Sequence, residues 1–153
     1  NYITREGAEA LRQEFKVLLK EKRPEVTKAV QAAAAMGDRS ENAEYIYGKK
    51  MLREIDRRIR YLEKRLEHVQ VVDRKPSDQT TVFFGAYVTL EDSQGQTRQL
   101  RIVGPDEIDT ERGWISIDAP LARALVKKQI DDEVIVRTPA GETSYFIIKV
   151  SYD

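Results

Sequence analysis

The sequence predicts an α+β protein: an N-terminal antiparallel α-helical hairpin of coiled-coil type, followed by a small antiparallel sheet domain with one helix. Three observations predict this fold. Apolar residues recur every three or four positions in the first half, as in packed helices. The polar stretch RKPSDQTT follows Asp73, and short runs of strand composition come after it. We therefore expect a coiled-coil arm at residues 1–75 and a second domain at residues 76–153.

Two apolar stripes predict the two helices of the arm. The second stripe is a heptad seam that extends back through Gly48 to Tyr45, and it consists of Leu52, Ile55, Ile59, Leu62, Leu66 and Val69. A looser stripe upstream consists of Leu11, Phe15, Leu18, Val26, Val30 and Ala33. Thr4 is the expected N-cap of the first helix, and Pro24 should kink that helix or mark a junction within it. Helices of this length give an arm about 40 Å long.

The turn between the helices, at residues 37–45, contains Asp38 and Glu41. Gly37 fits a C′ position, and Asp38 and Glu41 have the spacing of a capping box, which would begin the second helix. Two carboxylates are also an incomplete site for a hard cation such as Mg²⁺, which prefers oxygen ligands. Spacing favours the cap, and the metal interpretation stays open beside it.

Basic residues follow one side of the second helix. Between Lys49 and Arg65 there are eight basic and three acidic residues, and the stripe consists of Lys50, Arg53, Arg57, Arg60 and Lys64, widened by Arg58 and Arg65. This excess of positive charge is larger than salt bridges along the flank of a coiled coil need. The basic residues could therefore contact phosphates, or they could form a solvated flank, and both interpretations stay open.

Charge is also divided between the halves. The chain contains 26 basic and 26 acidic residues. Residues 1–75 hold 18 of the basic and 13 of the acidic residues, net +5, and residues 76–153 hold the other 8 and 13, net −5. This asymmetry suggests a basic element that faces a polyanion, joined to an acidic module. The chain has no cysteine and no apolar run of the roughly 20 residues that span a bilayer, so we expect a cytoplasmic protein.

The second half has strand composition at residues 82–91, 97–104, 114–118, 133–138 and 143–152. One short helix is expected between Asp118 and Gln129, with Asp118 or Ala119 at the N-cap and Pro120 in its first turn.

Several motifs resemble those of the bacterial Gre transcript cleavage factors, of the GreB type, along almost the whole chain. They are RPEVTKAV, GDRSENAEY, LREIDRRIRYL, VFFGAYV, RIVGPDEI, ISIDAPLARAL and TPAGE. The resemblance implies a transcription elongation factor that binds RNA polymerase and inserts its arm into the secondary channel. There it would stimulate cleavage of backtracked RNA by the polymerase, without a complete active site of its own. The second domain would be FKBP-like and would dock at the coiled coil of the channel rim.

The resemblance also implies roles for individual residues. Asp38 and Glu41 would be the catalytic carboxylates and would help hold a Mg²⁺ shared with the polymerase. The resemblance further implies a supporting role at the tip for Ser40, Asn42 and Tyr45, contact with backtracked RNA for Lys50, Arg53, Arg57 and Arg60, and polymerase docking for Asp118, Pro120 and Arg123. We expect a monomer when the protein is free, and no membrane partner.

Two other hypotheses stay open. The chain could occupy the channel and modulate transcription sterically, with the tip serving only as a helix cap. Alternatively, the second domain could be a prolyl isomerase joined to a dimerising coiled coil, although an FKBP-like fold does not imply that activity.

Overall fold

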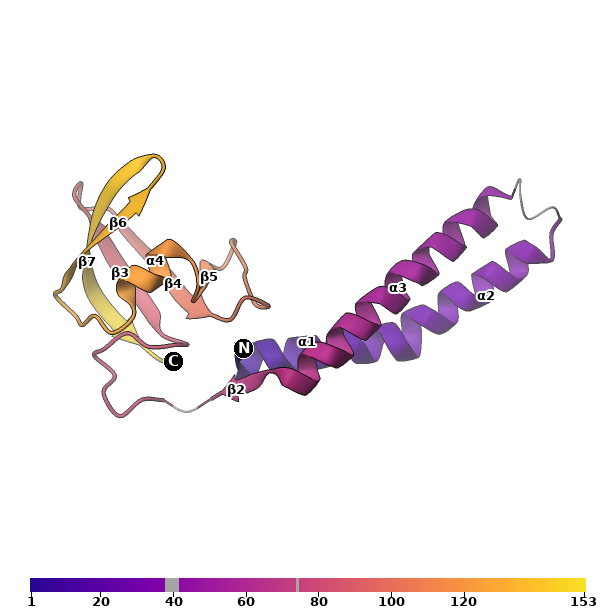
Figure 1. Cartoon of the computed structure of the whole chain (residues 1–153), viewed down its shortest axis with the longest axis horizontal. Helices are drawn as coiled ribbons and strands as arrows, with labels where there is room; N and C mark the ends of the chain where they lie inside the picture. Colours follow the sequence, from indigo (N-terminus) through magenta and orange to yellow (C-terminus); the bar gives the residue numbers. More distant parts are fainter. Residues whose placement is uncertain (38–41, 74) are drawn as a thin grey trace. The chain divides into compact units, whose positions relative to one another are not determined.

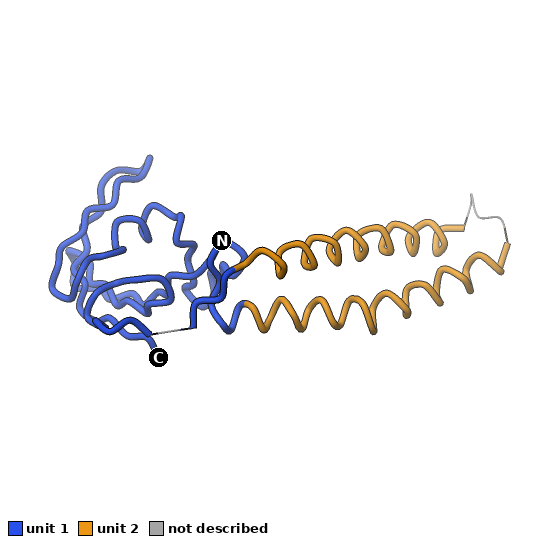
Figure 2. Tube along the Cα trace, turned by 60° about the horizontal axis from the view of Figure 1, so that its bottom comes forward, with its two compact units in different colours: residues 1–7, 70–153 blue, residues 8–69 orange. Residues whose placement is uncertain are grey.

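The computed structural model describes residues 1–37, 42–73 and 75–153. These residues form two compact units, one of residues 8–69 and one that combines residues 1–7 with residues 70–153 (Figure 2). Residues 1–7 and 70–75 thus group with the sheet, whereas the boundary expected from the sequence lies after residue 75, and that boundary stays a prediction. Within the described part of the chain, no helix has the length and apolar content needed to cross a membrane.

The arm is an antiparallel helical hairpin, as the sequence predicts (Figure 1). Its first side is formed by α1 (Arg5–Val17), a π-helical segment (Leu18–Lys22) and α2 (Arg23–Ala34). Its second side is the single helix α3 (Ala43–His68). The irregularity predicted at Pro24 is present as the π-helical segment, where the Arg23 N–H bonds the Leu18 carbonyl oxygen. Pro24 then follows in the first turn of α2, where its missing N–H costs no helical hydrogen bond.

The two predicted seams bury each other. Val26 of α2 packs with Ile55 and Ile59 of α3, and half-buried residues surround them, namely Phe15, Leu18, Val30, Met51 and Leu52. Gly48 allows the helices a close approach, because a Cβ atom there would lie 2.7 Å from Cγ2 of Val30. The arm is therefore held by an apolar interface along its length.

The second unit contains a five-stranded sheet of order β5-β4-β3-β7-β6 (Figure 1). The strands are β3 (Tyr87–Asp92), β4 (Thr97–Val103), β5 (Trp114–Ser116), β6 (Glu133–Thr138) and β7 (Gly141–Ser151). Neighbours pair antiparallel except β4 and β5, which pair in parallel because a connection of residues 104–113 separates them. The predicted α+β class is confirmed, and the parallel edge pair is an addition to it.

The short helix α4 (Pro120–Leu125) begins at the predicted N-cap, Ala119. It ends earlier than the sequence suggests, because Lys127 adopts a φ of 72° and its N–H bonds the Val82 carbonyl oxygen. Ala122 and Leu125 bury one side of α4 on the sheet, in a core formed with Val82, Ala86, Val88, Leu90, Leu100, Ile102, Val134, Ile147 and Val150.

A buried carboxylate holds the first residues of the chain within the sheet unit. The short strands β1 (Tyr2–Thr4) and β2 (Gln70–Val72) pair in parallel. Glu107 is only 8% exposed. One of its carboxylate oxygens accepts hydrogen bonds from the N–H groups of Thr4 and Gly104, at 2.8 Å each, and the other accepts a hydrogen bond from the Thr4 hydroxyl group. Thr4 also caps α1 as predicted, since its hydroxyl oxygen accepts the Gly7 N–H at 3.1 Å.

Candidate functional site

The candidate site is the end of the arm where α2 and α3 are joined. Asp38, Ser40 and Glu41 lie outside the described residues. On the α2 side, Ala35 is the C-cap, so Gly37 lies one residue beyond the expected C′ position, with a φ of 143° that favours glycine. The Met36 N–H bonds the Ala33 carbonyl oxygen at 3.2 Å, which closes the last turn of the helix.

Asn42 ties the two helices together at this end. Its side-chain oxygen accepts the Tyr45 N–H at 3.1 Å, which makes it the N-cap of α3, and its amide nitrogen donates to the Ala33 carbonyl oxygen at 2.6 Å. The capping box predicted for Asp38 and Glu41 is therefore wrong for α3, which begins after both residues. The hydrogen bond from Asn42 to the Ala33 carbonyl oxygen, at the end of α2, favours Asn42 as the cap.

Tyr45 lies in the first turn of α3 and is half-buried, with its N–H bound to Asn42. The next two residues, Ile46 and Tyr47, are exposed. Asn42 and Tyr45 thus shape the start of α3 at the base of the 38–41 segment.

The predicted basic stripe is on the solvent side of α3. Lys50, Arg53, Arg57, Arg60 and Lys64 are all exposed. With about 100° between successive residues of a helix, they fall opposite the buried side chains of Ile55 and Ile59. Among the residues that the structure describes, no carboxylate forms an ion pair with these five cations.

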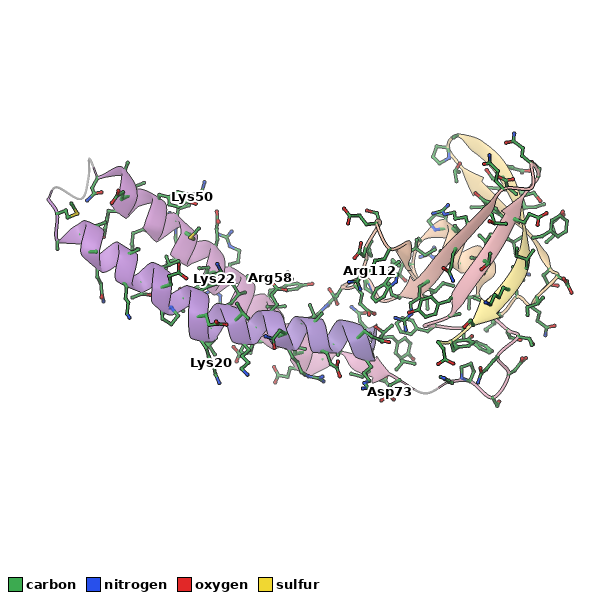
Figure 3. The ribbon with its side chains drawn as sticks, turned by 180° about the vertical axis from the view of Figure 1, so that it is seen from behind. Lys20, Lys22, Lys50, Arg58, Asp73 and Arg112 are labelled. Carbon is green, nitrogen blue, oxygen red and sulfur yellow. The ribbon has the colours of Figure 1, made fainter. Side chains whose placement is uncertain are left out.

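Acidic side chains of the arm pair with other arginines on its flanks. Asp56 accepts from Nε of Arg23 at 2.7 Å, and Glu14 accepts from Nε and Nη2 of Arg58 at 2.7 and 2.9 Å. The Arg58 hydrogen bond lowers the pKa of Glu14, and the Asp56 hydrogen bond raises the pKa of Arg23. Figure 3 shows Lys50 and Arg58 on α3. Neither of these two ion pairs involves one of the five cations of the stripe.

Asp118, Pro120 and Arg123, the residues of the expected docking region, are exposed at and beside α4. The turn before α4 is fixed by the Asp118 N–H, which donates to the Ser116 hydroxyl oxygen at 3.1 Å. Pro120 also lines a groove of about 280 Å³. The remaining lining residues come from β4, β5, α4 and the β6–β7 hairpin, and include Arg98, Ile115, Leu121, Val136 and Tyr145.

No group of three or more His, Cys, Asp or Glu residues that could hold a metal ion is found in ranges 1–37, 42–73 and 75–153. Sequence reasoning missed the buried Glu107 and the surroundings of Tyr61, which Arg58 and Arg65 approach within 5.1 and 5.9 Å of the ring centroid. Both features depend on contacts that the spacing of residues does not reveal.

Two known solved structures resemble the chain only distantly. A prokaryotic transcription elongation factor GreA/GreB from Nitrosomonas europaea is 23% identical, with a TM-score of 0.46 and coverage of 99% of this chain and 98% of that chain. The GreA factor homolog 1 protein of Thermus thermophilus is 24% identical, with a TM-score of 0.44 and coverage of 98% and 97%.

Sequence relatives are much closer. Transcription elongation factor GreB of Pseudomonas aeruginosa is 61% identical over 150 residues, which are 98% of this chain and 89% of the relative. GreB of Yersinia pestis is 60% identical over 152 residues, which are 99% and 89%. The family description "Transcription elongation factor, N-terminal" matches residues 1–71, and "Transcription elongation factor, GreA/GreB, C-term" matches residues 76–152. The chain belongs to the GreA/GreB family of transcription elongation factors.

Proposed function

We propose that this elongation factor binds RNA polymerase, inserts the arm into the secondary channel and stimulates the polymerase's own cleavage of backtracked RNA. The observation that carries the proposal is the position of the acidic segment 38–41 in a chain of this family: it joins the ends of α2 and α3 on a narrow helical hairpin. A hairpin has room in a channel that excludes a globular domain. The protein is then a catalytic accessory, acting as a cytoplasmic monomer.

Asp38 and Glu41 would hold Mg²⁺ together with groups of the polymerase. Carboxylate oxygens are the ligands that Mg²⁺ prefers, and one or two protein carboxylates are its usual share. When bound, the cation supplies water activation and charge stabilisation for phosphodiester hydrolysis. The chain's own contribution is to deliver the two carboxylates. The bonds of Asn42 to Tyr45 and Ala33 support that role, because they fix the ends of both helices.

The basic stripe would contact the extruded RNA, which is a single-stranded polyanion. The exposure of Lys50, Arg53, Arg57 and Arg60, and their lack of ion pairs among the described residues, support this assignment. The exposed residues Asp118, Pro120 and Arg123 would bind the coiled coil at the rim of the channel.

The proposal is tested by cleavage of stalled, backtracked complexes with Asp38→Asn and Glu41→Gln variants. Each should bind the polymerase nearly as well as the unaltered chain and fail to stimulate cleavage. The competing steric role treats these residues as a cap, so it expects Asp38→Ser with Glu41→Gln to retain full activity. Asn42 already serves as the cap of α3, which favours the role in cleavage. Unchanged cleavage by the single variants would refute the proposal.

A further inference from the structure

Tyr61 lies on the exposed side of α3 and is flanked by two arginines. It retains 43% of its surface, although it belongs to a helix that buries Ile59 and Leu62 beside it. The guanidinium carbon of Arg58 lies 5.1 Å from the ring centroid, and that of Arg65 lies 5.9 Å from it. We name these three side chains the Tyr61 platform. They present aromatic and guanidinium surfaces, both of which stack on nucleobases.

The platform is held in place before any partner binds. Glu14 accepts two hydrogen bonds from Arg58, at 2.7 and 2.9 Å, so the guanidinium is fixed from the opposite helix of the arm. A bidentate pair restrains the plane of the guanidinium as well as its position. Arg58 in turn restrains the Tyr61 ring through the cation–π contact. A ligand that stacks here therefore loses little side-chain entropy of the protein.

A shallow hollow of about 490 Å³ adjoins the platform on α3. Its lining consists of Arg57, Arg60, Tyr61, Glu63, Lys64 and Glu67. Arg57, Arg60 and Lys64 are exposed and form no ion pair within the described residues, so their charge is available to an anion. The two glutamates weaken the attraction for phosphate alone. A ligand that also stacks is consequently favoured over a simple anion.

We propose that the Tyr61 platform and this hollow form a base-stacking subsite for single-stranded RNA at the base of the arm. Aromatic side chains beside a basic groove are the usual means of binding a single strand without reading its sequence. Phosphates would lie along Arg57, Arg60 and Lys64, and a base would stack at Tyr61. The inference rests on the proposed function, which supplies the RNA, and adds an aromatic contact to the basic stripe.

The position of Tyr61 makes a length-dependent forecast. It lies 19 residues after Asn42, which corresponds to about 28 Å along the helix. At the spacing of about 3.4 Å per nucleotide in a stacked strand, about eight nucleotides cover that distance. RNA with only a few extruded nucleotides ends before the platform. The platform should therefore act only on long extruded segments.

The test measures cleavage in complexes of a bacterial RNA polymerase backtracked by about two and by about twelve nucleotides, lengths on either side of that estimate. Tyr61→Leu keeps an apolar side chain on the helix but removes the ring, and Tyr61→Phe keeps the ring as the matched control. We expect Tyr61→Leu to slow cleavage of the long segment about fivefold or more, as truncation of a stacking aromatic does. Tyr61→Phe should match the unaltered chain, and both variants should be unchanged on the short segment.

Equal rates for Tyr61→Leu and the unaltered chain on the long segment would overturn the subsite. An equal loss on both lengths would overturn it as well, because that result identifies a contact with the polymerase or a role in the arm's structure. If the unaltered chain fails to stimulate cleavage of the short segment, the proposed function itself fails, and the inference fails with it.

Discussion

Replacing Glu107 tests how the first residues of the chain are held within the sheet unit. Glu107→Ala leaves the Thr4 and Gly104 N–H groups, both buried, without their acceptor. A buried donor that loses its partner costs about 1–3 kcal/mol, so the two together predict a loss of about 2–6 kcal/mol in the free energy of unfolding. Glu111→Ala, at an exposed position on the same connection, is the control and should cost less than about 0.5 kcal/mol.

Glu107→Gln tests whether the hydrogen bonds of Glu107, and not only the volume of its side chain, stabilise this region. Thr4 and Gly104 donate to the same carboxylate oxygen, so the single oxygen of a glutamine can accept both bonds. Its amide nitrogen then faces the Thr4 hydroxyl, which can accept from it. We expect this variant to lose about 1 kcal/mol or less, the value of one ordinary hydrogen bond.

The assay for these variants is urea denaturation followed by the fluorescence of Trp114. It is the only tryptophan of the chain and lies in β5, in the same unit as Glu107. The reasoning is refuted if the glutamine variant is as unstable as the alanine variant. It is also refuted if Glu107→Ala is no less stable than Glu111→Ala.

Three further predictions concern the arm. Gly48→Ala should destabilise the arm by about 1 kcal/mol because the new methyl group meets Val30. In a Val30→Ala background the same substitution should stabilise the arm, because alanine is the better helix former. Thermal unfolding followed by circular dichroism gives the sign of each effect. The pKa of Glu14 is lowered by Arg58, so this pair adds stability above the ordinary pKa of a glutamate and loses it as the pH falls through the lowered value. Both side chains are more than a third exposed, so Glu14→Gln should lower the free energy of unfolding by at most about 1 kcal/mol at pH 7 and not at all at pH 2. Denaturant midpoints at the two pH values measure this, and an equal loss at both would contradict the prediction. Asn42→Ala should cost about 2 kcal/mol and Asn42→Ser about 1 kcal/mol less, since serine restores only the cap; equal losses would argue against a capping role.

Much of the arm could be predicted from the sequence because its structure follows from local periodicity. The seam through Ile55 and Ile59 fixes which side of α3 is buried, and thereby places Lys50 and Arg57 on the exposed side. The break before Pro24 was also predictable, because proline cannot continue a helical ladder. Its form as a π-helical segment was not, because the position of a proline does not say whether the helix before it kinks, ends or widens.

Features that depend on distant contacts could not be predicted. The capping-box spacing of Asp38 and Glu41 is a local signal, and Asn42 prevails as the cap because it also reaches the Ala33 carbonyl oxygen. Glu107 lies 103 residues from Thr4, and no pattern in the sequence joins them. The platform at Tyr61 was missed for the same reason, because the fixing carboxylate of Glu14 is on the other helix.

The central claim is that Asp38 and Glu41 act in cleavage and contribute little to binding. The most direct measurement titrates the Asp38→Asn, Glu41→Gln double variant into backtracked complexes and records the maximal cleavage rate. Its binding is measured separately, as the concentration that half-displaces the unaltered chain. We predict that the maximal rate falls to that of the polymerase alone, while competition with the unaltered chain shows nearly unchanged binding. A maximal rate equal to that of the unaltered chain would contradict the account.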